Sequence, residues 1–207
     1  GTGEKMFTKT KFASFDLIDN LQKGIDNLGW EYVTQVQKET IPLALAGRDV
    51  IGQARTGSGK TASFGIPILN DCKPTGDLQA LIIAPTRELA GQVAEELNNL
   101  QGDCGLKIIT VYGGTDLEKQ AKQLQSGVDI VVGTPGRVMD MTKRSFLNVE
   151  DASYFVLDEA DRMLDMGFFP DVMWIVERMT NRKQNLLFSA TFPQEVIDAA
   201  NEFTNEP

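Results

Sequence analysis

Histidine is absent from all 207 residues of the sequence, and cysteine occurs only twice, as Cys72 and Cys104. The absence of histidine excludes the Ser-His-Asp and Cys-His mechanisms of hydrolases, and it excludes histidine-ligated zinc. Two cysteines are typical of a protein from a reducing compartment, and we expect both to be free structural thiols. The chemistry of this chain must therefore rest on other side chains.

Long apolar runs and excess positive charge are also lacking. Runs such as residues 80–84 fall far short of the roughly 18 residues that a membrane span needs, and residues 1–10 contain no apolar segment of a secretory signal. The net charge is −9, which disfavours a surface that binds nucleic acid over its whole area but leaves room for a small basic track. Composition and length therefore predict a soluble, cytoplasmic, single-domain protein with no membrane partner.

Short apolar runs rich in β-formers alternate with helical stretches along the chain. We expect strands over residues 49–52, 79–84, 107–112, 129–132, 154–157 and 185–188, and helices over residues 62–69, 88–100 and 117–125. Continuous apolar runs of this length are typical of a parallel sheet covered by helices on both faces. Functional loops of such sheets lie at the carboxyl ends of the strands, where each run here ends in Gly, Pro, Ser, Thr or acidic residues. The sequence therefore predicts an α/β fold with its site along one edge of the sheet.

A glycine-rich segment joins the first of these strands to the first of these helices. It consists of Ala54, Arg55, Thr56, Gly57, Ser58, Gly59, Lys60 and Thr61. This is the phosphate-binding loop pattern, with Ala54 where the strict form has its first glycine. Glycines let backbone N–H groups turn toward phosphates, and we expect Lys60 to reach the β- and γ-phosphates while the Thr61 hydroxyl ligates Mg²⁺. A plain glycine-rich turn is the alternative, and the strand and helix on either side argue against it.

An acidic run, Asp158-Glu159-Ala160-Asp161, follows the strand at residues 154–157. We expect Asp158 to hold Mg²⁺ through its water shell and Glu159 to orient or deprotonate an attacking water. The predicted catalytic residues are therefore Lys60, Asp158 and Glu159. An acidic helix N-terminus stabilised by the macrodipole is the alternative, but the phosphate-binding loop upstream favours the metal site.

Together, these two segments resemble the DEAD-box ATP-dependent RNA helicases. Segments 85–90, 113–114, 134–137 and 189–191 resemble the family's motif Ia, glycine doublet, motif Ib and motif III, in the family's order. The resemblance covers about residues 12–207 and implies a RecA-like P-loop domain, ATP and Mg²⁺ as cofactors, and sequence-independent binding of single- or double-stranded RNA. The RNA track would comprise Pro85, Thr86, Arg87, Gly113, Gly114, Thr134, Pro135, Gly136 and Arg137, whereas Asp161, Ser189 and Thr191 would couple the nucleotide to domain closure.

Residues 29–37 resemble the family's Q motif. Gln37 would then hydrogen-bond the edge of adenine, with Thr34 beside it and Trp30 against the base. Phe12 stands where the family has an isolated upstream aromatic residue. The two usual prolines are missing and Trp30 replaces a smaller aromatic, so core aromatics with a surface glutamine remain the alternative.

The resemblance also predicts how the chain is organised. We expect a flexible flank over residues 1–11, a Q-motif region over residues 12–38, and an ATP-binding domain over residues 39–207 that forms one compact unit with it. The family's second RecA-like domain, with its arginine fingers, has no counterpart in this sequence. We therefore expect a monomeric fragment that binds nucleotide weakly and hydrolyses it barely by itself. An ATP-gated RNA clamp without useful catalysis and another P-loop translocase remain alternative functions.

Two further features have alternative interpretations. The pairs Lys143-Arg144 and Arg182-Lys183 are interpreted first as solvated surface and second as RNA contacts. The apolar residues among 163–169 are interpreted first as helix packing on the core and second as a binding surface.

Overall fold

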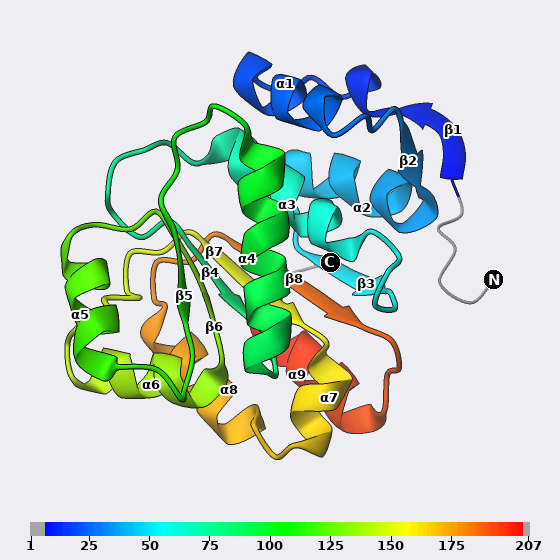
Figure 1. The fold of residues 1–207 in the computed structure, drawn as a ribbon. Helices are drawn as coiled ribbons and strands as arrows, with labels where there is room; N and C mark the ends of the chain where they lie inside the picture. The colour runs from blue at the N-terminus through cyan, green and yellow to red at the C-terminus, as the bar shows by residue number, and fades with distance from the viewer. Residues whose placement is uncertain (1–6, 205–207) are drawn as a thin grey trace.

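Residues 7–204 are described by a computed structural model, and their centre is a six-stranded sheet whose paired strands are all parallel. The strand order is β3-β8-β7-β4-β6-β5 (Figure 1). The strands are β3 (Val50–Gln53), β4 (Ala80–Ile83), β5 (Ile108–Val111), β6 (Ile130–Gly133), β7 (Tyr154–Asp158) and β8 (Gln184–Ser189). Each lies within one residue of its predicted bounds, so the predicted α/β fold with a parallel sheet is confirmed.

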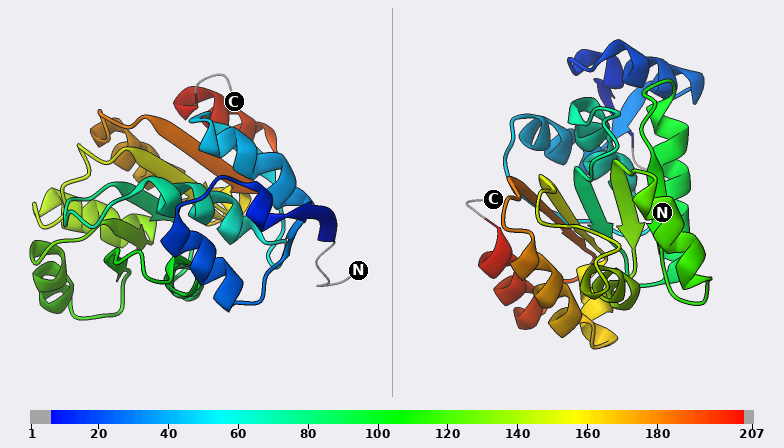
Figure 2. Two further views of the ribbon diagram at one scale, coloured as in Figure 1. Left: turned by 90° about the horizontal axis from the view of Figure 1, so that it is seen from above. Right: turned by 90° about the vertical axis from the view of Figure 1, so that its left-hand side faces the viewer.

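Helices cover both faces of this sheet (Figure 2). One core cluster joins the sheet to α1 (Asp19–Asn27), α2 (Gln35–Leu45), α3 (Lys60–Asp71) and α4 (Arg87–Gln101). The other joins it to α5 (Leu117–Gln125), α6 (Pro135–Lys143), α7 (Ala160–Asp165), α8 (Phe169–Arg178) and α9 (Gln194–Phe203). The three predicted helices correspond to α3, α4 and α5.

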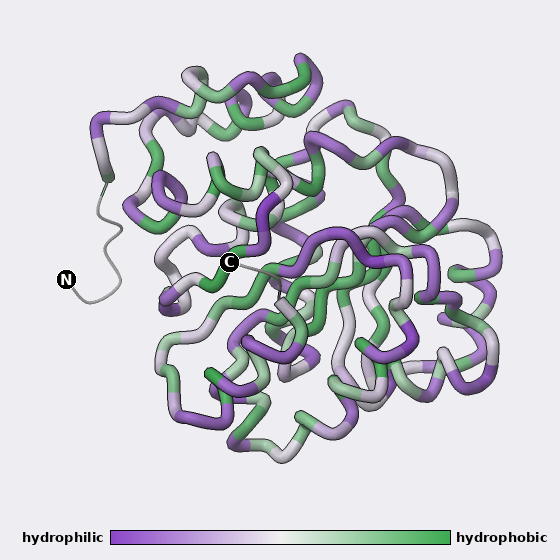
Figure 3. The backbone as a smooth tube through the Cα atoms, turned by 180° about the vertical axis from the view of Figure 1, so that it is seen from behind, coloured by the Kyte–Doolittle hydropathy of each residue, from purple (hydrophilic) through white to green (hydrophobic). Residues whose placement is uncertain are grey.

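Neighbouring residues of the central strands face opposite cores, as the two-residue period of a strand requires. Ile82 and Val132 belong to the cluster under α1–α4, whereas Leu81 and Val131 belong to the cluster under α5–α9. Every residue of β4, β6 and β8 is buried. In Figure 3 the hydrophobic colour gathers on these inner strands, while hydrophilic residues occupy helices and loops around them. Burial on both faces explains why the strands are continuous apolar runs.

Several helices begin at a polar residue that follows a strand. Thr86 caps α4, because its hydroxyl accepts a hydrogen bond from the Leu89 amide at 3.2 Å. Thr34 and Gln37 form a reciprocal capping box at the start of α2. Such caps satisfy backbone N–H groups that have no partner within the helix. The turns between strands and helices, which carry the predicted motifs, are thereby held in defined conformations.

The N-terminal part of the chain forms a small second sheet that the sequence did not predict. Strand β1 (Phe7–Lys11) pairs antiparallel with β2 (Tyr32–Thr34), and the Thr8 hydroxyl donates to the Val33 carbonyl at 2.9 Å. A short 3₁₀ helix, η1 (Phe12–Ser14), follows β1. Residues 7–11 are therefore a strand rather than the expected flexible flank, and residues 1–6 lie outside the described residues. The pairing partners are far apart in the sequence, so local patterns did not reveal them.

The remaining expectations have mixed outcomes. Within residues 7–204, none of the helices is both long and apolar enough to cross a bilayer. Both cysteines are free, with Cys72 buried, as predicted. Arg182 differs from the expected solvated surface: it is partly buried and donates to Asn185 Oδ1 at 2.8 Å. Of the apolar residues after the acidic run, Met163 is fully buried and most others pack on the core, but Met166 is 45% exposed.

Candidate functional site

The glycine-rich segment forms the turn between β3 and α3, at the carboxyl edge of the sheet. Gly57 and Gly59 have φ angles of 86° and 88°, a region that L side chains rarely adopt. At Gly59 a side chain would also meet the Gln37 amide nitrogen at 2.5 Å. Ala54 has no positive φ, is buried, and donates its N–H to the Ser189 carbonyl at 3.0 Å. This position therefore does not require the glycine of the strict pattern.

Lys60 is the first residue of α3, directly after this turn, and its side chain lies between two carboxylates. Its Nζ atom is 3.0 Å from Asp158 Oδ1 and 3.2 Å from Glu159 Oε2, and all three side chains are at least 90% buried. Within the described chain these two oxygens have no hydrogen-bond partner apart from Lys60, which stabilises them through its charge and its short contacts. Burial raises the pKa of Asp158 to about 6, although Lys60 opposes the shift. Three predicted catalytic residues are thus brought together from two distant segments.

Glu159 has a backbone conformation that few non-glycine residues adopt. Its φ and ψ are 57° and 53°, in the left-handed region, immediately before the first residue of α7. Such a conformation costs about 1–3 kcal/mol and persists where the surrounding structure enforces it. Here its side chain contacts Lys60 and lies 3.4 Å from the Thr56 hydroxyl. The strain is therefore associated with the placement of this carboxylate beside the glycine-rich turn.

A cavity of about 100 Å³ lies over this cluster. Its wall includes Thr61, Asp158 and Glu159, which supply only oxygen atoms, the ligands that Mg²⁺ prefers. Among the described residues, no group of three or more His, Cys, Asp or Glu could hold a metal alone. Mg²⁺ is commonly bound by one or two carboxylates with substrate phosphates and water. The residues present therefore fit a magnesium ion that arrives with a phosphate ligand.

One face of α4 forms another part of the same wall. Leu89, Gln92, Val93 and Glu96 line the cavity, although none was predicted as a site residue. Their spacing of three and four residues is that of one helical face, which was the available signal. The predicted residues Arg55 and Ser58 do not line this cavity; the Ser58 hydroxyl instead donates to the Arg55 carbonyl at 2.6 Å.

A second cavity, of about 380 Å³, lies beside the first. Its lining includes Phe12, Trp30, Thr34 and Gln37, all predicted, and also Phe7, Gly29, Glu31 and Tyr32. The rings of Phe12 and Trp30 lie 5.8 Å apart. The Gln37 side chain donates to the Gly59 carbonyl at 3.1 Å and accepts from the Thr34 amide at 2.8 Å. Gln37 is therefore a buried link between the aromatic cavity and the glycine-rich turn, and not the surface glutamine of the alternative interpretation.

Phe7 and Tyr32 reach this cavity only because β1 pairs with β2. Tyr32 is 39% exposed and Phe7 is 65% exposed, so the aromatic cavity is open to solvent on this side. The β-forming residues Phe7, Thr8 and Thr10 were a weak local signal for a strand. It could not identify the partner strand.

The predicted nucleic-acid residues line a shallow groove of about 390 Å³. They are Pro85, Thr86, Arg87, Gly113, Thr134, Pro135, Gly136 and Arg137, and Met166 and Phe168 complete the wall. Gly114 does not line the groove, but it adjoins Arg87, since a side chain at Gly114 would lie 3.2 Å from Arg87 Nη1. The helix-cap role of Thr86 is also present, so the cap and the groove share this residue.

The three predicted coupling residues are joined by hydrogen bonds. The Asp161 amide donates to the Ser189 hydroxyl at 3.1 Å, and the Thr191 hydroxyl donates to Asp161 Oδ2 at 2.9 Å. Partial burial opposes ionisation of Asp161, but hydrogen bonds from Thr191, Arg162 and Ser189 outweigh it and hold the pKa below its usual value. The end of β8 is thus tied to the start of α7, one residue after Ala160 and two after Glu159.

Comparison with known proteins gives consistent results. A family profile described as DEAD/DEAH box helicase matches residues 34–199. The chain is 47% identical over 196 residues to "RNA helicase CrhR" of Synechocystis sp. and 45% identical over 197 residues to "DEAD-box ATP-dependent RNA helicase CshA" of Bacillus subtilis. Each match covers 95% of this chain but 40% of the relative, so the chain spans about two fifths of these relatives. A crystal structure of a DEAD box protein from Methanococcus jannaschii is also similar, with a TM-score of 0.91, 45% identity, and coverage of 95% of this chain and 54% of that one.

Proposed function

This chain belongs to the DEAD/DEAH box helicase family, and from that premise we propose that it is the nucleotide-binding half of an ATP-dependent RNA helicase. The observation that carries the proposal is the hydrogen bond between Gln37 and the Gly59 carbonyl. It joins an aromatic cavity of suitable size for a nucleobase to a glycine-rich turn that suits phosphates. One nucleotide could span both cavities, beside the groove that contains Arg87 and Arg137.

The base would be adenine, because Gln37 retains unused hydrogen-bonding capacity. Its Oε1 atom accepts one hydrogen bond and can accept another, while its Nε2 atom donates one and can donate another. An amide can therefore accept from the adenine N6 amino group and donate to N7. Guanine presents acceptors at both O6 and N7, so its O6 would face the amide oxygen without a proton between them.

The phosphates would compete with Asp158 and Glu159 for Lys60. Lys60 is paired with both carboxylates, so its side chain must move away from them to contact the β- and γ-phosphates when nucleotide binds. Thr61 and Asp158 would hold Mg²⁺, which neutralises charge on the phosphates when it is bound. Glu159, released from Lys60, would orient the attacking water and accept its proton.

RNA would bind the groove through its phosphates and riboses rather than its base edges. Arg87 and Arg137 supply charge, and the N-termini of α4 and α6 supply backbone N–H groups. Recognition of this kind does not depend on sequence. The track would thus take any RNA strand of suitable shape.

Hydrolysis at a useful rate would require a second RecA-like domain of the same protein. An arginine finger supplied from outside an NTPase site contributes about 10³- to 10⁵-fold in rate. In this proposal residues 12–38 and 39–207 act as one unit that supplies the residues for nucleotide binding and water activation, and the second domain supplies the arginine finger. The hydrogen bonds among Asp161, Ser189 and Thr191 would couple nucleotide binding to closure of the two domains. This closure would drive local unwinding of RNA.

The first test is calorimetric titration of the chain with Mg-ADP, Mg-GDP and Mg-pyrophosphate. We expect ADP to bind more tightly than GDP, and Gln37→Ala to reduce ADP affinity by roughly 5- to 150-fold, the effect of one bidentate base contact. Pyrophosphate does not present a base, so its binding should persist in Gln37→Ala if the mutant is folded. Gln35→Ala, at an exposed position of the same helix, is the matched control. Equal binding of ADP and GDP, unchanged by Gln37→Ala, would leave only a general NTPase.

Catalysis is tested separately in a protein that contains both RecA-like domains. Glu159→Gln should abolish RNA-stimulated ATP hydrolysis while ATP-dependent RNA binding persists, because the amide cannot accept the proton of water. Equal hydrolysis by the variant would favour a role for Glu159 in structure alone.

A further inference from the structure

Arg137, on the wall of the RNA groove, is oriented by two uncharged oxygen atoms. Its Nη1 atom donates to Gln120 Oε1 at 3.0 Å, and its Nη2 atom donates to the Thr115 carbonyl at 3.3 Å. Among residues 7–204, Arg137 has no acidic side chain within ion-pair distance. The guanidinium is therefore held at two points while its full positive charge stays available.

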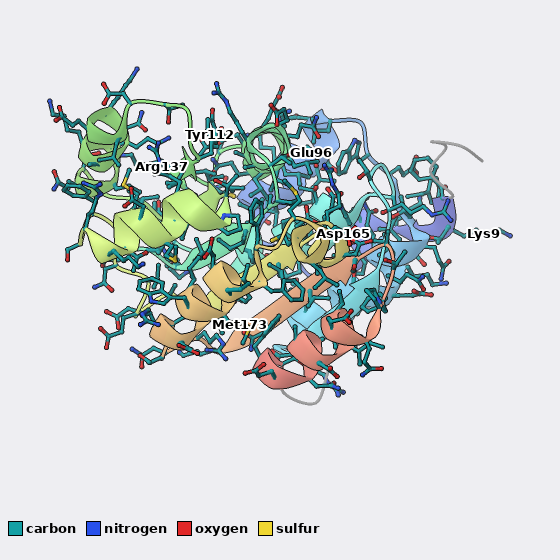
Figure 4. All side chains as sticks on the ribbon, turned by 90° about the horizontal axis from the view of Figure 1, so that it is seen from below. Lys9, Glu96, Tyr112, Arg137, Asp165 and Met173 are labelled. Carbon is teal, nitrogen blue, oxygen red and sulfur yellow. The ribbon has the colours of Figure 1, made fainter. Side chains whose placement is uncertain are left out.

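Three other arginines of this protein are held by carboxylates instead. Arg144, Arg162 and Arg178 each pair with a carboxylate, so a neighbouring negative charge offsets theirs. Arg87, the other arginine of the groove, lies over the ring of Tyr112 at 4.9 Å, which again orients a cation without a full negative charge. Figure 4 shows Tyr112 and Arg137 on the same side of the molecule. Both groove arginines thus depend on the segment that follows β5.

Gln120 is built into this segment as a fixed support. It lies on α5, is only 6% exposed, and uses each polar atom of its side chain. Its Nε2 atom donates to the Tyr112 carbonyl at 3.2 Å and to the Thr115 hydroxyl, and its Oε1 atom faces Arg137. A carbonyl can only accept and a guanidinium can only donate, so these partners determine the orientation of the amide. Gln120 cannot turn away from Arg137 without leaving a buried polar group unsatisfied.

We propose that Gln120 is a positioning residue for nucleic-acid binding: it holds the guanidinium of Arg137 toward the groove without neutralising it. The inference rests on the proposed RNA-binding function of that groove. A carboxylate at position 120 would still bind Arg137, but it would lose the hydrogen bond to the Tyr112 carbonyl and would cancel the charge of Arg137 toward phosphate. An apolar residue of similar length would leave the charge but release the side chain. The neutral amide combines a fixed orientation with an uncompensated charge.

Two substitutions separate these effects. Binding of a fluorescein-labelled decauridylate to the chain is measured by fluorescence anisotropy at several salt concentrations. Gln120→Glu should reduce the slope of log K against log salt by about 0.7, the value for one phosphate contact on a single strand, which is about eightfold in affinity near 50 mM salt. Gln120→Met should keep the slope of the unmodified chain but weaken binding about two- to tenfold, because a freed arginine must be ordered on binding.

The controls separate positioning from general charge and from unfolding. Gln123→Glu places the same charge at an exposed position three residues further along α5, and it should change the slope little. Arg137→Met should reduce the slope as much as Gln120→Glu does, and combining the two should cause no further loss. Thermal unfolding of each variant shows whether it is folded at the assay temperature. Equal slopes for Gln120→Glu and Gln123→Glu, or unchanged affinity in Gln120→Met, would overturn the inference.

A second measurement does not depend on RNA. In NMR spectra of the arginine side chains, the guanidinium of Arg137 should rotate slowly in the unmodified chain and freely in Gln120→Met, while other arginines are unchanged. If the chain bound no RNA but this difference were present, the proposed RNA groove would be wrong while the positioning of Arg137 by Gln120 would stand. If Arg137 rotated freely in the unmodified chain, the inference itself would be refuted.

Discussion

Replacing Lys60 by methionine is expected to lower the free energy of unfolding by about 3–5 kcal/mol at pH 8 in the absence of nucleotide and metal. This is the usual cost of removing one partner from a buried ion pair. Lys60 is the cation between Asp158 and Glu159, at 3.0 and 3.2 Å, and both carboxylates are buried. Methionine has nearly the same length, so the main change is the loss of charge. For a domain of this size the loss corresponds to a fall in melting temperature of about 6–20 °C.

The destabilisation should depend on pH in a defined direction. The folded-state pKa of Asp158 is about 6, above the usual value for an aspartate, so the folded state binds this proton more tightly than the unfolded state. Ionised Asp158 therefore reduces stability above pH 6, and protonation removes this cost as the pH falls below 6. Lys60 lowers the pKa of Asp158, so its removal raises that pKa further and makes the relief at low pH larger.

The assay is thermal unfolding by circular dichroism in EDTA, at pH 8 and at pH 5.5. We expect a large difference between Lys60→Met and the unmodified chain at pH 8 and a much smaller one at pH 5.5. Adding Asp158→Asn to Lys60→Met should restore much of the stability at pH 8, because one buried charge is removed. A fall of less than about 2 °C at pH 8, or equal falls at both pH values, would refute the electrostatic reasoning.

Three further predictions concern other parts of the molecule. Gly24→Ala should destabilise the chain by about 1–3 kcal/mol, because a methyl group there would collide with the backbone carbonyl of Leu100. The measurement is urea unfolding, and an unchanged midpoint urea concentration would contradict this close approach. Asp161→Asn should reduce stability at neutral pH but not in acid. The pKa of Asp161 is lower in the folded than in the unfolded state, so its ionised side chain stabilises the fold above the unfolded-state pKa, and this contribution is lost as the pH falls through the folded-state pKa. Thr191→Val should show the same pH dependence in thermal unfolding. Cys72 should resist a thiol reagent at pH 8 until the chain is unfolded, because burial raises its pKa to about 12, and fast labelling of both thiols in the native state would contradict this.

Local patterns determined much of the site because its residues lie in short segments that follow strands. Lys60 follows a glycine turn, and Asp158 ends a strand, so neighbouring residues alone identified their chemistry. Parallel strands bring their carboxyl ends to one edge, which is why residues about 100 positions apart could be expected to meet. The proximity of Lys60 to Asp158 and Glu159 follows from this rule, whereas their ion pairs were found only in the folded chain.

Tertiary structure decided how these segments are supported. The pairing of β1 with β2 opened the aromatic cavity to Phe7 and Tyr32, and the face of α4 added Gln92 to the phosphate cavity. The local signals, helical spacing in α4 and a weak strand signal in β1, did not identify these contacts, because each contact depends on the approach of elements that are far apart in the chain.

The division between the two levels has a physical basis. The sequence by itself determined the α/β class, the strands and the phosphate-binding turn, because hydrophobic periodicity and turn chemistry act over a few neighbouring residues. The groove residues were predicted from the resemblance to the DEAD-box helicases. Only the folded chain decided the strand order, the left-handed conformation of Glu159, and the hydrogen bond from Arg137 to the neutral amide of Gln120. A buried side chain acquires its partner and its strain from packing against distant elements, and a pattern of neighbours does not contain that information.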